Sequence, residues 1–245
     1  MIVNPTNEGW EIFSHSAHGL LAGKIANEVQ DKYKNKNWVA TLAAIIEHDD
    51  RQLDFNEKNY LTKTGAPKDF LLENRTVSEI IKRSKRLLEQ AEKKSTWISM
   101  LIVHHLIFIY KEMASEKKTI RDFLEKLDKK EQQYIKSQNL TRDEVDSIYQ
   151  IMVFADRCSL ILCQAAVPNK NRMLEVNTSI NDQTFWISEK PTTNIRIEPW
   201  IFRSKHFTIS AEYKLIEKNS FSSNEEFQRL LSESPVRFKT WTFSK

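Results

Sequence analysis

The sequence predicts an α+β protein, in which an all-α bundle (residues 1–167) is followed by an antiparallel β appendage (residues 168–245). Two observations, one on periodicity and one on composition, support this prediction. Apolar residues recur at helical spacing before Pro168 and alternate with a period of two after it. The composition changes at the same place, since all four glycines lie in the first 65 residues and four of the six prolines follow residue 167.

The first region contains six stretches with a helical apolar pattern. They cover residues 14–32, 38–48, 76–92, 96–113, 120–137 and 141–167. Thr76 with Glu79, and Thr141 with Glu144, have the spacing of a capping box, which marks two helix starts. Gly19 and Gly23 lie one turn apart and would let a second helix approach closely.

The second region contains segments that alternate between apolar and polar residues. The clearest is HFTISAEYKLIEK, and the others are QTFWIS, TNIRIEP and VRFKTWTF. Alternation of this kind indicates strands of an antiparallel sheet with one face solvated. A short helix is expected at residues 223–231, and the opening MIV is a candidate for one further strand of the sheet.

Composition restricts the class of protein. Hydrophobic residues make up 40% and charged residues 29% of the 245, as in ordinary globular domains. The apolar runs are shorter than the about 20 residues that cross a bilayer, and the N-terminus lacks the pattern of a secretory signal. Cys158 and Cys163 are interpreted as reduced, buried thiols. We therefore expect a cytoplasmic protein without a membrane partner.

The net charge of +4 arises from lysines and arginines that are interleaved with acids along several helices. This pattern is typical of solvated helix faces, so a nucleic-acid partner is not favoured. A homo-oligomer remains open, with the β region as a candidate dimer surface.

Ionisable groups interrupt otherwise apolar stripes on four helices. They are His18, the pair His48 and Asp49, the pair His104 and His105, and Asp156. Burial of an ionised carboxylate is costly unless it is paired or coordinated, and a helical bundle brings such stripes to one centre. Two imidazoles and two carboxylates suit a divalent ion, Mn, Fe, Mg or Zn. A hydrogen-bonded core network is the alternative.

The order of these residues, H…HD…D, resembles the HD-domain superfamily of metal-dependent phosphohydrolases. The whole chain also resembles a bacterial domain-of-unknown-function family, family 3891. The matching segments are MIVNPTNEGW, AHGLLAGKIA, AAIIEHDD with Asp54 after it, TGAPKDF, VHH, ADRCSLILC and PVRFKTWTF. Arg51-Gln52 stands where the related sequences have Gly-Trp.

The superfamily resemblance implies that the metal ligands are His18, His48, Asp49 and Asp156, in an HD-like helical bundle. It also implies a metal-bound water that attacks a phosphorus ester. The family resemblance carries no established activity.

The leading hypothesis is a metal-dependent phosphohydrolase that acts on a small phosphate ester or nucleotide. In it, His105 and Asp50 orient ligands or move protons, and Arg51 or Lys24 is a candidate phosphate contact. A dinuclear iron oxygenase of the HD-like type is less favoured, because it needs two further separated histidines and only the adjacent His104 and His105 are available. The third hypothesis is a non-catalytic HD-like binding or structural protein. His15 and His206 are assigned packing or surface roles.

Overall fold

A computed structural model describes residues 1–50, 54–169, 172–189 and 194–245. Its α-helices are α1 (His15–Asn27), α2 (Trp38–Glu47), α3 (Val77–Glu92), α4 (Thr96–Glu116), α5 (Lys118–Ser137), α6 (Arg142–Cys163) and α7 (Asn224–Glu233). Its strands are β1 (Ile2–Thr6), β2 (Gly9–Phe13), β3 (Leu174–Thr178), β4 (Thr184–Glu189), β5 (Ile195–Glu198), β6 (His206–Ile216) and β7 (Val236–Ser244). None of the helices in these ranges is long and apolar enough to cross a membrane.

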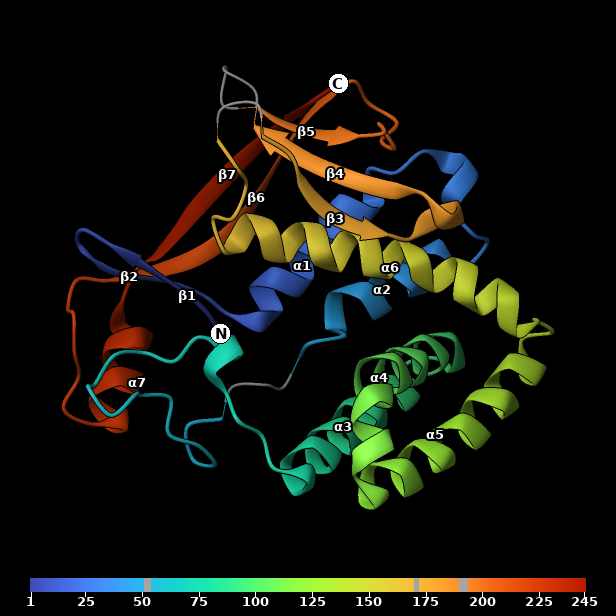
Figure 1. Ribbon diagram of the computed structural model, residues 1–245, viewed down its shortest axis with the longest axis horizontal. Coiled ribbons are helices and arrows are strands. Elements are labelled where there is room, and N and C mark those ends of the chain that lie inside the picture. The colour runs from blue at the N-terminus through green and yellow to red at the C-terminus, as the bar shows by residue number, and fades with distance from the viewer. Residues whose placement is uncertain (51–53, 170–171, 190–193) are drawn as a thin grey trace.

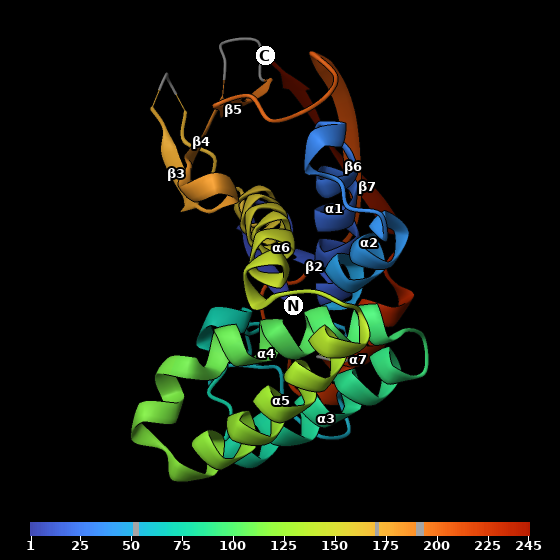
Figure 2. The same ribbon diagram turned by 90° about the vertical axis from the view of Figure 1, so that its right-hand side faces the viewer.

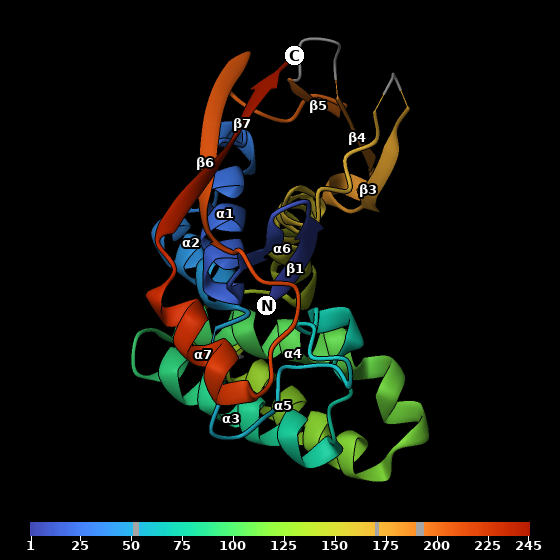
Figure 3. The same cartoon turned by 90° about the vertical axis from the view of Figure 1, so that its left-hand side faces the viewer.

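All of these strands belong to one sheet, in the order β1-β2-β6-β7-β5-β4-β3. The neighbouring strands are antiparallel except β5 and β7, which run parallel. The sheet is curled, with the long strands β6 and β7 on one side and β3, β4 and β5 on the other (Figures 2 and 3). Helix α1 packs on β6, and α6 packs on α1 and β3.

The predicted fold class, an all-α bundle with a C-terminal β appendage, is therefore wrong. The described residues form a mixed α/β structure with a seven-stranded sheet, and β1 and β2 from the N-terminus belong to that sheet. Trp10 of β2 pairs with Ile216 of β6. Local periodicity does not reveal pairing between segments that are so far apart in the chain. Only the MIV segment was considered as an N-terminal strand, whereas the structure has a hairpin.

Helices α1 and α2 approach each other unusually closely, at the two glycines of α1. A Cβ atom added at Gly19 would lie 2.2 Å from the carbonyl oxygen of Ile46, and one at Gly23 would lie 2.4 Å from Ile46 Cγ1. Real Cβ atoms do not approach other atoms so closely, so the two glycines permit this packing. The contact sets the distance between His18 on α1 and His48 at the end of α2.

The helices α3, α4 and α5 form a second layer below α6 (Figure 1). This layer has its own apolar core, which includes Leu88, Leu101 and Leu124. Both predicted capping boxes are confirmed, one at Thr76 at the start of α3 and one at Thr141 at the start of α6. The ionisable groups of interest lie between this layer and the α1–α6 layer.

Candidate metal centre

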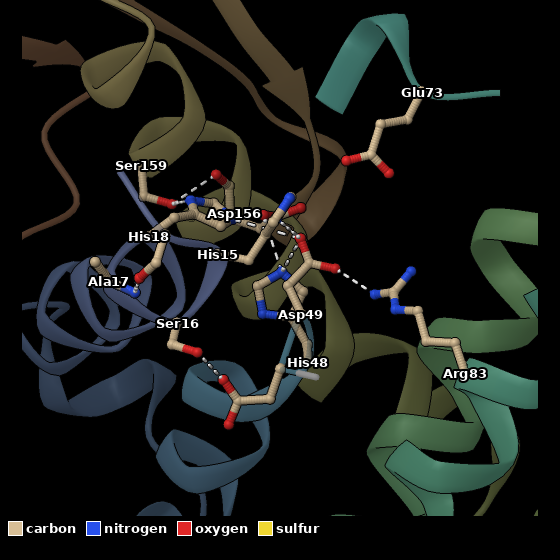
Figure 4. A network of polar contacts seen from close by, with 12 residues as sticks. His15, Ser16, Ala17, His18, His48, Asp49, Glu73, Arg83, Asp156 and Ser159 are labelled. Carbon is tan, nitrogen blue, oxygen red and sulfur yellow. Dashed lines mark hydrogen bonds and ion pairs between the residues drawn. The ribbon is translucent and has the colours of Figure 1, made fainter. Parts of the chain in front are cut away.

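Three helices bring the four predicted ligands together. Helix α1 carries His18, α6 carries Asp156, and His48 and Asp49 follow directly after α2, which ends at Glu47. Two adjacent residues inside a helix point about 100° apart, so a helix end is where both can face one point. Figure 4 shows the side chains of His18, His48, Asp49 and Asp156 directed toward one another.

The donor atoms of these residues lie within a few ångströms of one another. Asp156 Oδ1 is 2.9 Å from His18 Nε2 and 3.1 Å from His48 Nε2. Asp49 Oδ2 is 4.0 Å from His18 Nε2 and 3.8 Å from His48 Nε2. The two imidazoles are fully buried, whereas the carboxylate side chains of Asp49 and Asp156 are 20% and 26% exposed. The site is therefore closed on the imidazole side and accessible on the carboxylate side.

Hydrogen bonds on the far side of each imidazole determine which nitrogen faces the centre. His48 Nδ1 lies 2.6 Å from the carbonyl oxygen of Ile45, which can only accept, so Nδ1 carries the hydrogen. Ser159 Oγ donates to the carbonyl oxygen of Asp156 and lies 2.8 Å from His18 Nδ1, from which it accepts. With no hydrogen on Nε2, each imidazole therefore presents a lone pair to the centre at that atom.

These lone pairs face a carboxylate, which also offers only lone pairs. His18 Nε2 is buried and makes no hydrogen bond to any described residue, although Asp156 Oδ1 is 2.9 Å away. His48 Nε2 is within hydrogen-bonding distance of Asp156 Oδ1, at 3.1 Å. Such an arrangement is repulsive unless a metal ion or a proton on Nε2 lies between the atoms. Partners that fix the outer nitrogen of a histidine in this way are typical of metal ligands.

The spacing fits a divalent ion. Two ligand atoms bound at 2.0–2.2 Å and at cis or tetrahedral angles lie about 2.8–3.6 Å apart, which covers both contacts of Asp156. The contacts of Asp49 are slightly longer. His18, His48 and Asp49 each offer one atom within 4.8 Å of the others, and this is the one such group of potential ligands among the described residues.

The charges of the cluster shift its pKa values in opposite directions. Burial alone would lower the pKa of His48, but the negative charges of Asp156 and Asp49 outweigh it and raise that pKa to about 9. Burial would raise the pKa of both carboxyl groups, but His48 above all holds the pKa of Asp49 and of Asp156 well below the usual range. Near neutral pH and without a metal, both carboxylates are therefore ionised and His48 is protonated, so a metal ion that binds here would replace that proton.

Comparison with known proteins agrees with part of the sequence-based interpretation. Residues 1–218 match the family described as Protein of unknown function (DUF3891). The chain belongs to this family. No curated protein and no solved structure matches the chain.

In this DUF3891 protein Arg83 contacts the candidate metal centre, although it was not among the predicted site residues. Its Nη2 is 2.9 Å from Asp49 Oδ1, and the residue is only 7% exposed (Figure 4). The sequence does place Arg83 in the apolar stripe of its helix, because Arg83 follows Ile80 by three residues and precedes Leu87 by four. A charged residue in an inward stripe needs a buried partner.

His15 was assigned a packing or surface role, but the structure places it beside Asp49. Its ring is buried against Phe70, and its Nδ1 lies 3.4 Å from Asp49 Oδ2. That distance is too long for a well-formed hydrogen bond, and neither nitrogen has a hydrogen-bond partner in the described part of the chain. Burial lowers the pKa of His15 to about 4. The overlooked signal was the spacing of three residues from His18, which places both on one face of α1.

The two residues predicted to act in catalysis have different partners. His105 is buried on α4, its ring centroid is 5.0 Å from that of His48, and its Nδ1 is 2.9 Å from the hydroxyl of Tyr149. Burial, together with the nearby charge of His48, lowers the pKa of His105 to about 3. The carboxylate of Asp50 instead accepts a hydrogen bond from Ser16 Oγ at 2.6 Å.

The remaining candidates have other partners. His104 Nδ1 lies 2.5 Å from Glu131 Oε1, and Glu131 is fully buried, so His104 belongs to a separate polar cluster. Lys24 Nζ donates to the carbonyl oxygen of Ser210 at 2.6 Å, which directs it toward β6 rather than toward a phosphate at the centre. Arg51 and Gln52 lie outside the described residues.

Proposed function

We propose that this chain is a metal-dependent phosphohydrolase of the HD type, which acts on a small phosphate ester or nucleotide through a metal-activated water. The observation that carries the proposal is the convergence of two Nε2 lone pairs on two carboxylates, with the outer nitrogen of each imidazole already hydrogen-bonded. The H…HD…D order of these ligands supports the HD type. Their partial exposure on the carboxylate side leaves room for a substrate.

His18, His48, Asp49 and Asp156 would hold the ion. A divalent ion there supplies positive charge for the phosphate and lowers the pKa of a bound water toward neutrality. In the hydrolysis, a water oxygen bonds to phosphorus, the bond from phosphorus to the ester oxygen breaks, and the leaving alcohol takes a proton. Ser159 and the carbonyl of Ile45 keep the two imidazoles oriented throughout.

In this proposal His105 orients a reacting group by hydrogen bonding, because its pKa of about 3 keeps the ring neutral. If the hydroxyl of Tyr149 donates to Nδ1, then His105 presents an Nε2–H group as a donor. The ring stands edge-on to His48, at 82° between the two planes. Asp50 is held by Ser16, so its part is to fix the end of α2 against α1.

The first alternative is a non-catalytic, HD-like structural or binding protein. It is supported by the raised pKa of His48, because a proton on Nε2 would satisfy Asp156 without a metal. The dinuclear iron oxygenase has less support. Asp49 Oδ1 bonds Arg83, which supplies a positive charge on the side where a second ion would share that carboxylate. His104, one of the two further histidines, contacts Glu131 instead.

Elemental analysis of purified protein tests the proposal. We expect about one Mn, Fe or Zn per chain, and near-complete loss of it in Asp49→Ala and Asp156→Asn. Asp146→Asn is the matched control, because Asp146 is an exposed carboxylate that pairs with His104, a histidine outside the centre. Loaded protein should hydrolyse p-nitrophenyl phosphate, and the two metal-free variants should not.

Two results would contradict the proposal. Protein that contains no metal and shows no thermal shift with Mn or Fe would favour the structural alternative. Two ions per chain, together with consumption of oxygen by the iron form, would favour the oxygenase.

A further inference from the structure

A polar pocket of about 360 Å³ lies next to the metal centre, on the side of Arg83. It is formed by α3 and by the segments around residues 54–60 and 73–76, and nine of its twelve lining residues are charged. Glu73 and Arg83 both line this pocket, and Figure 4 shows them on the same side of the centre. Its size is within the range of small-molecule sites.

Cations exceed acids in the wall of the pocket. The five cations are Lys58, Arg75, Lys82, Arg83 and Arg86, and there are four acids. Two of those acids are each shared by two cations, since Glu73 pairs with Lys58 and Arg75, and Glu57 pairs with Lys82 and Arg86. A third acid, Glu79, accepts the backbone N–H of Thr76 in a capping box. The fourth acid, Asp54, lies 4.0 Å from Arg86. The wall keeps an excess of one cation, which favours an anionic ligand.

Two of the cations have hydrogen-bond donors that no described residue uses. The Nε atoms of Arg83 and Arg86 are both buried and without a hydrogen-bond partner in the described part of the chain. Arg83 is itself more than nine-tenths buried, and it joins the pocket to Asp49 of the centre. An unmet buried donor is costly and is usually satisfied by water or a ligand.

The two arginines are arranged in a line that starts at the metal centre. They are three residues apart on α3, so their side chains are neighbours on one face of the helix. Arg83 contacts a metal ligand, whereas Arg86 lies one turn further along and closer to solvent, with 37% of its side chain exposed. The line contains a positive group next to the centre and a second one beyond it.

We propose that this pocket binds two successive anionic groups of the substrate, the first at Arg83 and the second at Arg86. This inference rests on the proposed phosphohydrolase function and narrows its substrate class to phosphate compounds that carry a second phosphoryl group next to the first. The wall of charged residues suits a polar remainder of the substrate and not an apolar one.

Calorimetric titration with orthophosphate and pyrophosphate tests the proposal. Protein as purified is dialysed free of unbound metal, and its metal content is measured before and after titration, so that removal of the ion by pyrophosphate is detected. We expect pyrophosphate to bind at least ten times more tightly than orthophosphate. In Arg86→Gln this preference should disappear while orthophosphate binding is kept. In Arg83→Gln both affinities should fall at least tenfold.

Arg121→Gln is the matched control, because Arg121 is an exposed arginine on α5 that contacts a backbone carbonyl outside the pocket. Arg83→Lys keeps a positive partner for Asp49 and removes the planar fork, so it separates loss of anion recognition from loss of folding. Equal affinity for the two anions in the parent protein would overturn the inference, and so would an unchanged preference for pyrophosphate in Arg86→Gln. If the protein still contains its metal, the proposed function survives either result. Absence of metal from the purified protein would instead contradict the proposed function. In that case, titration of EDTA-treated protein with the two anions still measures whether Arg83 and Arg86 bind them.

Discussion

Ser159 and His18 are joined by a 2.8 Å contact between Oγ and Nδ1, across the interface of α6 and α1. Ser159 is fully buried, and it passes its own hydrogen to the carbonyl oxygen of Asp156, three residues earlier on the same helix. One hydroxyl therefore orients one candidate ligand and bonds to the backbone of another. This places Ser159 among the residues on which the geometry of the centre depends.

Ser159→Ala should weaken metal binding by about 10- to 100-fold, the usual effect of removing the outer partner of a ligand histidine. The dissociation constant for Mn or Zn, measured by competition with a chromophoric chelator, checks this. Ser99→Ala is the control, because Ser99 is a fully buried serine of α4 that donates to the carbonyl oxygen of Ser95, the residue before that helix. An equal change in metal affinity in both variants would show that the effect is one of general stability.

Gly19→Ala should separate α1 from α2 and impair both folding and metal binding, because the added methyl group would meet a backbone oxygen that has little room to move. Gly23→Ala meets only the side chain of Ile46, so it should cost about 1–3 kcal/mol in the free energy of unfolding. The double variant Gly23→Ala/Ile46→Ala should recover part of that loss. Urea denaturation measures all three, and strictly additive effects of Gly23→Ala and Ile46→Ala would contradict the close contact.

The metal-free protein should lose stability as the pH rises from about 6.5 to about 9. The folded-state pKa of His48, about 9, lies above its usual value, so its contribution is fully present below about pH 6.5 and is lost as the pH passes the folded pKa. The loss should be on the order of 3 kcal/mol. Other groups also titrate in this range, so the measured quantity is the difference in unfolding free energy between the parent protein and His48→Gln. A difference that does not vary between pH 6.5 and 9 would show that His48 is neutral in the folded state.

His104 and His105 are adjacent in the chain but should behave differently on substitution. His105→Gln should reduce kcat for phosphate ester hydrolysis by about 10- to 100-fold with the metal retained, as expected for a neutral residue that orients a reacting group by hydrogen bonding. His104→Gln should leave kcat nearly unchanged and lower the melting temperature, because it leaves the fully buried Glu131 with one partner fewer. Steady-state kinetics, metal analysis and thermal melts of both variants decide this, and a loss of kcat confined to His104→Gln would reverse the assignment.

Local patterns predicted the helices well. The capping boxes at Thr76 and Thr141 placed the starts of α3 and α6, because a cap depends on residues three apart in the chain. The predicted helix at residues 14–32 was too long, since α1 ends at Asn27 and a short 3₁₀ turn covers Asp31–Tyr33. The β1–β2 hairpin was missed for a different reason. Its stability depends on β6, whose residues lie at the other end of the chain.

In the candidate site, too, local sequence patterns predicted some features and missed others. The ligand types were visible because charged and imidazole groups interrupted apolar stripes, and burial of such groups requires a partner wherever it occurs. The partners Arg83 and His15 were not identified. Each has an ordinary place in an amphipathic helix, and their importance comes only from their contacts with Asp49.

The sequence alone determined which segments are helical, which ionisable residues are placed on apolar faces, and which family the chain belongs to, because these properties depend on residues near in the chain or on their order. The tertiary structure decided that one curled sheet unites both ends of the chain, that Asp49 lies among an arginine and three imidazoles, and that a cationic pocket adjoins the centre. Distances between side chains on different elements depend on how those elements pack, and here that packing depends on two glycines that bring α1 against α2.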